Sequence, residues 1–199
     1  MKNFIIFLSA CVILGCSNSF LPSGPLEAHQ MVAKTTADVI VASDRKALSA
    51  ALGGIVQTSH WKIVLKDWQL DLESSEIGPG GVKLELSGQI NHEGEKVTMS
   101  IFSVSNIEEP VDFITAMLGD LGTSDSTEII KGVKVDVSDQ PGAILLVGRR
   151  GVSGQEFATV DLITGKNHVG YTVMCGGKAE RIESFGPFCA GVIKSFEFK

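Results

Sequence analysis

Apolar and polar residues alternate along much of the second half of the chain, as they do in half-buried β-strands. The clearest example lies at 82–86 and 97–101, where every second residue is Val, Leu, Met or Ile. Between these runs lies Asn91-His92-Glu93-Gly94, and Asn and Gly are turn formers. We therefore predict an antiparallel hairpin with one buried face over 82–101.

More apolar runs extend this hairpin to a larger sheet. They occupy 129–137, 143–147, 157–163 and 169–175. Turns are expected at 139–142 and 164–167, because both segments contain turn-forming residues. The Gly-rich segment 148–154 predicts a loop, and Gly176-Gly177 predicts the end of the last long strand.

The alternation changes phase around the two tryptophans. Odd positions are apolar from Trp61 to Leu65, and even positions are apolar from Trp68 to Leu72. A bulge or turn at Lys66-Asp67 would restore a common buried face. The same residues also fit helical spacing, but the β-rich surroundings favour strands.

Apolar residues at helical spacing predict two helices beside the sheet. The first covers 110–121, because Pro110 suits the first helical position and the acidic Glu108-Glu109 suits the positive helix end. Its expected buried residues are Val111, Ile114, Met117, Leu118 and Leu121. The second covers 187–195, and the residues expected to point inward are Cys189, Val192, Ile193 and Phe196.

Two earlier helices are expected within 27–37 and 43–52, and whether Ile40-Val41 forms a short strand stays open. Together these elements predict an α+β fold class, mostly antiparallel β-sheet with flanking helices.

The first sixteen residues, MKNFIIFLSACVILGC, have a different character. Lys2 precedes an apolar run that is too short to cross a bilayer, which needs about 20 residues. The run ends in Ile13-Leu14-Gly15-Cys16. This segment resembles a bacterial lipoprotein signal peptide that ends in a lipobox. The resemblance implies cleavage before Cys16 and acylation of that cysteine, which would anchor the protein to a membrane.

The domain organisation depends on this anchor. Residues 1–15 are expected to be removed as the signal peptide, 16–26 to form the lipidated cysteine and a Pro- and Ser-containing tether, and 27–199 to form a single α+β domain. Ser17, and not Asp, comes directly after Cys16. By resemblance to enterobacterial sorting, this places the protein in the cell envelope, at the outer membrane facing the periplasm if the host has two membranes.

The charge and cysteine content limit the classes of partner and predict one disulfide. The formal net charge is −6, and Arg149-Arg150 is the longest basic run. Nucleic-acid binding is therefore disfavoured, because it needs clustered basic groups. Once Cys16 is lipidated and Cys11 leaves with the signal, Cys175 and Cys189 remain. In an oxidising compartment a Cys175–Cys189 disulfide is expected, and two free buried thiols are the alternative.

A search for reactive groups yields no predicted catalytic, cofactor-binding or metal-binding residue. The four histidines lie far apart in the sequence, and no His/Cys pair has the spacing of zinc ligands. The glycines of 148–154 match neither a dinucleotide-binding motif nor a P-loop. Arg149 and Arg150 lie in this expected loop, and they are candidates for contact with a partner carboxylate, a glycan or an anionic headgroup. The alternative is that both arginines are simply solvated.

The order of elements from 108 to 198 resembles the PsbP-like/DcrB fold, an α/β/α sandwich. The matching features are the 110–121 helix before a strand, the small-residue turn at Gly165, the strand at Tyr171-Thr172-Val173 and the final Ser195-Phe196. The resemblance implies a binding or accessory module and supplies no catalytic residue.

These observations favour a lipid-anchored envelope protein that binds another protein without catalysis. Such a protein could act in envelope assembly or maintenance, or as an immunity-type inhibitor of a toxin delivered to the periplasm. One alternative is a carrier of a small ligand or lipid, held between sheet and helix. The other is an enzyme whose site is not recognisable from the sequence.

The anchor is testable by replacing Cys16 with Ala, which removes the thiol that would carry the lipid. Label from palmitate should appear in the wild-type chain and not in the Cys16→Ala chain, and membrane sedimentation of the variant should fall. Cys11→Ala is the matched control, and it should be labelled and should sediment like the wild type. Equal labelling of the Cys16→Ala chain would contradict the anchor.

Overall fold

The computed structural model describes residues 39–41, 54–71, 81–151 and 153–199. The predicted signal peptide, Cys16, the tether and the predicted helices within 27–37 and 43–52 lie outside the described residues. The described ranges include every element of the predicted sheet and both helices expected beside it.

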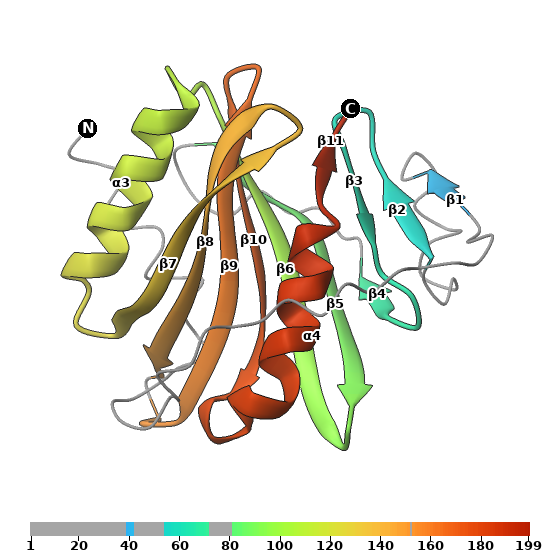
Figure 1. Cartoon of the computed structure of the whole chain (residues 1–199), viewed down its shortest axis with the longest axis vertical. Coiled ribbons are helices and arrows are strands. Elements are labelled where there is room, and N and C mark those ends of the chain that lie inside the picture. The colour runs from blue at the N-terminus through green and yellow to red at the C-terminus, as the bar shows by residue number, and fades with distance from the viewer. Residues whose placement is uncertain (1–38, 42–53, 72–80, 152) are drawn as a thin grey trace.

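The main element is a seven-stranded antiparallel sheet (Figure 1). Its strands, in spatial order, are β4 (Gln69–Asp71), β5 (Val82–His92), β6 (Glu95–Ser105), β10 (Val169–Lys178), β9 (Glu156–Lys166), β8 (Gln140–Arg150) and β7 (Thr127–Val137). A smaller sheet has the order β1 (Val39–Val41), β2 (Ile55–Gln57), β3 (Trp61–Val64) and β11 (Glu197–Phe198). Helix α3 (Pro110–Thr123) lies on one face of the large sheet, and helix α4 (Ile182–Lys194), preceded by the 3-10 turn η1 (Ala179–Arg181), lies on the other. The predicted α+β fold with flanking helices is confirmed.

The predicted hairpin at 82–101 is present as β5 and β6. Glu93 and Gly94 form its turn, both with positive φ, as a tight hairpin requires. Leu86, Val97 and Met99 are almost completely buried, so this part of the predicted buried face is confirmed. The prediction is wrong at the start of β5, because the register shifts between Leu84 and Leu86, and Val82 packs against the core on the other face of the sheet.

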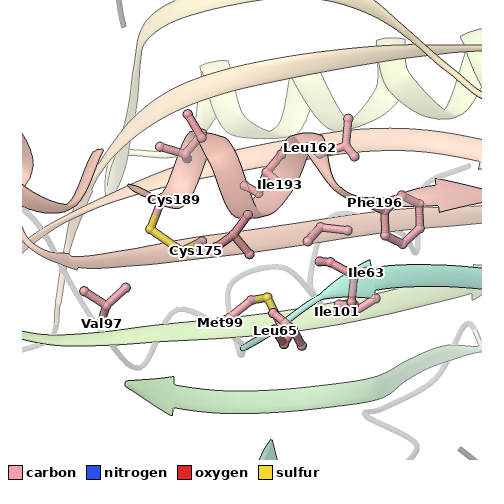
Figure 2. Packing of buried hydrophobic residues seen from close by; sticks show 14 of the residues in the cluster. Ile63, Leu65, Val97, Met99, Ile101, Leu162, Cys175, Cys189, Ile193 and Phe196 are labelled. Atoms are coloured by element: carbon pink, nitrogen blue, oxygen red, sulfur yellow. A yellow bond between two sulfur atoms is a disulfide. The ribbon is translucent and has the colours of Figure 1, made fainter. Parts of the chain in front are cut away.

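The larger of two cores lies between the sheet, α4 and β3 (Figure 2). Ile193 of α4 packs there with Ile63 and Met99, which come from the two different sheets. Burial, followed by the negative charge of Glu85, raises the pKa of Tyr171 in this core to about 12.

The phase change near the tryptophans has the predicted cause. Asp67 has φ +67°, and the chain turns at Lys66-Asp67. The turn takes the chain from β3 in the small sheet to β4 at the edge of the large one. As a result, Trp61 and Trp68 are both buried in the same core.

The second core lies beneath α3. Phe113, Met117 and Leu121 of α3 face the sheet, so the predicted helix is confirmed but its predicted buried face is partly wrong. Val111 is 57% exposed. The residues of α3 that contact the sheet are instead spaced four apart, and the first of them is Phe113. The reason is steric: a Cβ on Gly170 would lie 2.7 Å from the Phe113 ring, so the bare backbone of β10 makes room for this side chain.

Other predicted boundaries need correction. The loop expected at 148–154 begins later, because β8 continues through Arg150 and pairs with β7 and β9. Gly176-Gly177 does not end β10, which continues to Lys178 while paired with β9. The closing helix begins at Ile182 and not at Pro187, since Ile182 and Phe185 extend the buried helical face.

The turns at 139–142 and 164–167 are displaced as well. Ser138-Asp139 and Asn167-His168 have positive φ and make the two hairpin turns. Pro141 and Gly165 lie inside strands. In the part of the chain that the structure describes, no helix has the length and apolar character needed to span a membrane.

The packing of α3 predicts opposite effects for two Gly→Ala changes. Gly170→Ala should lower the free energy of unfolding by about 1–3 kcal/mol, because the methyl group collides with Phe113. Gly119→Ala, on the exposed side of α3 where the added methyl meets nothing, should raise it by up to about 1 kcal/mol. Denaturant unfolding measures both. A Gly170→Ala chain as stable as the wild type would contradict the close packing of α3 on β10.

Candidate functional site

A hollow of about 360 Å³ opens on the α3-side face of the large sheet. Helix α3 contacts mainly β7, β8 and β9, and the hollow lies over β6, β10 and the start of β9. Its size falls in the range of small-molecule pockets, about 300–1,000 Å³. It is the candidate binding site of the described chain.

Strand register places the lining residues side by side. Because side chains alternate, residues with even numbers on β6 and β10 and odd numbers on the start of β9 share this face. In the β6–β10 pair, Phe102 lies opposite Thr172, Ser100 opposite Met174, and Thr98 opposite Gly176. The apolar lining side chains are Phe102, Phe157 and Met174, with Met99 of β6 also at the lining, and the hydroxyl groups come from Thr98, Ser100 and Thr159.

Arg149 forms part of the wall of this hollow. Its side chain is 3% exposed, its Nε donates to Thr159 Oγ1 at 2.9 Å, and its Nη2 donates to the carboxylate of Asp161. Asp161 is itself 1% exposed. Arg149 therefore does not lie in the predicted loop, and the alternative of a solvated side chain is wrong as well. Arg149 is one half of a buried ion pair, whose desolvation cost is offset by the opposite charge.

The ion pair is incompletely hydrogen bonded. Arg149 Nη1 and Asp161 Oδ1 are buried and have no hydrogen-bond partner. Buried polar groups are almost always paired, so these two atoms mark an unusual point in the structure. Arg149 lines the hollow, whereas Asp161 is not among its lining residues.

Arg150 is separated from Arg149 in space. It is exposed at the end of β8, and its backbone N–H donates to Ser126 O at 2.8 Å. Successive residues of a strand point to opposite faces, so the two arginines do not form one basic patch. Of the two predicted partner-binding residues, Arg150 is the accessible one.

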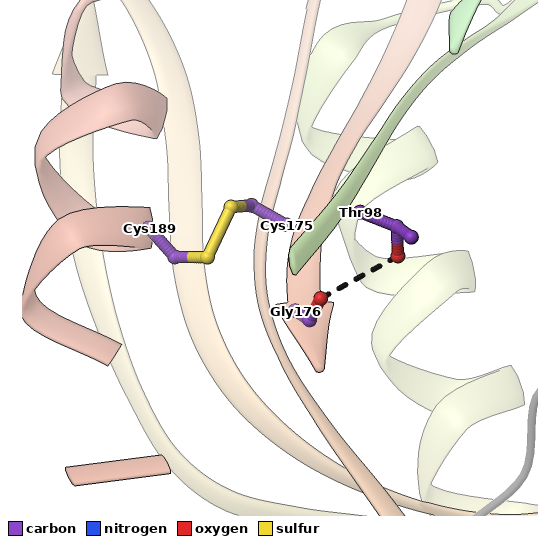
Figure 3. The surroundings of a disulfide bond; sticks show 4 residues. All are labelled: Thr98, Cys175, Gly176 and Cys189. Carbon is purple, nitrogen blue, oxygen red and sulfur yellow. Dashed lines mark hydrogen bonds between the residues drawn. A yellow bond between two sulfur atoms is a disulfide. The ribbon is translucent and has the colours of Figure 1, made fainter. Parts of the chain in front are cut away.

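Cys175 and Cys189 form the expected disulfide (Figure 3). It joins β10 to α4 with a Cα–Cα distance of 5.4 Å, and both residues are completely buried. Thr98 Oγ1 donates to Gly176 O at 3.4 Å on the other face of the same strands. The disulfide therefore fixes α4 against the strands whose opposite face lines the hollow.

The described histidines do not form a cluster. The His92 ring stacks on Phe188 with 4.1 Å between centroids, and His168 Nδ1 lies 3.2 Å from Ile107 O. Within the ranges that the structure describes, no group of three or more His, Cys, Asp or Glu residues could hold a metal ion.

Comparison with known proteins gives the fold. No family model matches the chain, and no curated protein matches its sequence. Among solved structures, it is similar to PsbP (CyanoP) from the cyanobacterium Synechocystis sp. PCC 6803, with 12% identity and a TM-score of 0.51 over 71% of this chain and 88% of that one. This similarity supports the predicted PsbP-like architecture.

Two other solved structures are more distant. LpqN of Mycobacterium tuberculosis, involved in cell envelope biogenesis, has 11% identity and a TM-score of 0.46, covering 80% of this chain and 88% of that one. The immunity protein TplEi of Pseudomonas aeruginosa has 15% identity and a TM-score of 0.37, covering 61% of this chain and 47% of that one.

The buried ion pair makes a prediction about stability. Arg149→Met or Asp161→Leu alone should lower the free energy of unfolding by about 3–5 kcal/mol, because each leaves an uncompensated buried charge. The double variant Arg149→Met/Asp161→Leu should recover most of this loss. Lys62→Met, which breaks an exposed pair with Glu197, is the control and should cost less than about 1 kcal/mol. Additive losses in the double variant would contradict the coupling of Arg149 to Asp161.

Proposed function

We propose that this protein is a lipid-anchored component of the bacterial cell envelope that acts as a non-enzymatic binding module for another protein. Cys16, in its lipobox-like sequence, supplies the anchor. The proposed location is the outer membrane facing the periplasm, if the host has two membranes. The proposed roles are envelope assembly or maintenance, or inhibition of a toxin delivered to the periplasm.

The observation that carries the proposal is the Cys175–Cys189 disulfide. Disulfides persist in oxidising compartments and are rare in the cytosol, so this bond supports an exported domain independently of the N-terminal sequence. A loop of this length contributes about 3 kcal/mol of stability by limiting the unfolded chain. That contribution suits a domain held outside the cytoplasm.

A tethered module needs little affinity. An acyl anchor confines the domain to the membrane face, which raises its effective concentration toward any partner at the same surface. The exposed Arg150 is the proposed contact for a carboxylate of that partner, because guanidinium binds carboxylate with two parallel hydrogen bonds.

Capture from an envelope extract tests the proposal. The full chain carrying Cys16→Ser, immobilised as bait, should retain a discrete protein that Arg150→Glu releases. Lys134→Glu reverses an exposed charge on neighbouring β7 and is the matched control, so it should retain the same protein. Retention of no protein above background would contradict a protein partner, and equal retention by the Arg150→Glu bait would remove Arg150 from the interface.

A further inference from the structure

We propose that the hollow on the α3-side face binds a single-chain amphiphile with an anionic head. This inference goes beyond the proposed function, because it concerns a small ligand and does not depend on a protein partner. It rests on the distribution of apolar groups and charges around the hollow.

Two of the three apolar lining side chains, Phe102 and Met174, lie toward one end of the hollow, and the third, Phe157, lies opposite Lys178 at the other end. Phe102 of β6 and Met174 of β10 lie in the paired part of these two neighbouring strands, and both side chains are half-buried. From Lys96 to Phe102 the strand rises about 20 Å, so the lining is elongated. An apolar chain lying along β6 would remove these side chains from water, and burial of apolar surface is the main source of affinity for such ligands.

The positive charges lie at the other end. Lys96 and Lys178 both line the hollow and both are exposed. They extend the β6–β10 pairing on the same face, and a Cβ on Gly177 would lie 3.3 Å from Lys96 O, so the two strands are still adjacent there. Like charges on neighbouring strands repel each other, and an anion placed between them relieves that repulsion.

Neither lysine forms an ion pair with another described residue. The ion pairs among the described residues are Lys62–Glu197, Lys83–Glu85 and Arg149–Asp161, and none includes Lys96 or Lys178. Glu95 also lines the hollow, which leaves one excess positive charge from the lysine pair. This cluster is unusual in a chain with a net charge of −6, and it suits a head with one negative charge.

The accessible charge comes from the lysines alone. Arg149 also lines the hollow, but its side chain is 3% exposed and is paired with Asp161. A cationic head would meet the ammonium groups of Lys96 and Lys178 here. The chemistry therefore selects an anionic amphiphile over a cationic one.

Calorimetry on the full chain carrying Cys16→Ser, without detergent, tests the proposal. The probes are dodecanoate, dodecan-1-ol and dodecyltrimethylammonium, each below its micelle concentration. Dodecanoate should bind about tenfold more tightly than the other two, which is the effect of one charge-assisted contact. Equal affinity for all three probes, or no binding of dodecanoate, would overturn the proposal. Binding of an acidic peptide in place of dodecanoate would overturn it too.

Two variants assign binding to the two ends of the hollow. Lys96→Gln/Lys178→Gln should weaken dodecanoate about tenfold and leave dodecan-1-ol unchanged. The control Lys131→Gln/Lys134→Gln removes the same charge from exposed positions of β7, and it should leave the affinity for both dodecanoate and dodecan-1-ol unchanged. Ser100→Phe fills the hollow with a residue that strands favour, and it should abolish binding of both probes while the melting temperature is retained. Undiminished binding of dodecanoate by either the Lys96→Gln/Lys178→Gln chain or the Ser100→Phe chain would overturn the proposal.

Because this assay uses purified protein, the absence of an envelope partner leaves its result unchanged. Failure of the amphiphile proposal and failure of the proposed function are therefore separate outcomes.

Discussion

The alternation of side chains along a β-strand is the constraint on which this structure depends. β6, β10 and β9 pair along most of their length, so each strand must supply two different surfaces at once. On β10, Val173 and Cys175 enter the core beneath α4, while Gly170 and Met174 lie on the α3 side. A slip of one residue would exchange these sets, so the disulfide, the seat of α3 and the hollow all require a single register.

The sequence predicts elements whose signals are local. The hairpin at 82–101 and the helix that begins at Pro110 have their own turn residues and periodicity, and both were correctly predicted. The buried face of that helix was only partly predictable, because Phe113 and Val111 are both apolar and the choice between them depends on the space above Gly170. A distant strand makes that choice, and no pattern within the helix records it.

The candidate site was least accessible to prediction. Gly148 and Gly151 favour a loop locally, but hydrogen bonds from β7 and β9 keep β8 extended through Arg150. Arg149 can be buried because Asp161 on the next strand neutralises it, and that pairing is visible only in the register. The hollow likewise collects residues from three strands. Cys16 lies outside the described residues, so its lipidation stays a prediction from sequence.

The small sheet links distant parts of the chain. β11 pairs with β3, so Phe198 lies opposite Trp61, and their neighbour Phe196 stacks on Trp61 in the main core. A contact between residues so far apart in sequence carries a large loop-closure entropy, which opposes its formation. The Trp61 side of the core therefore cannot be completed until residue 198 is available. A chain that is threaded through a membrane from its N-terminus would stay unfolded in that region throughout its passage, and it would fold only after arrival.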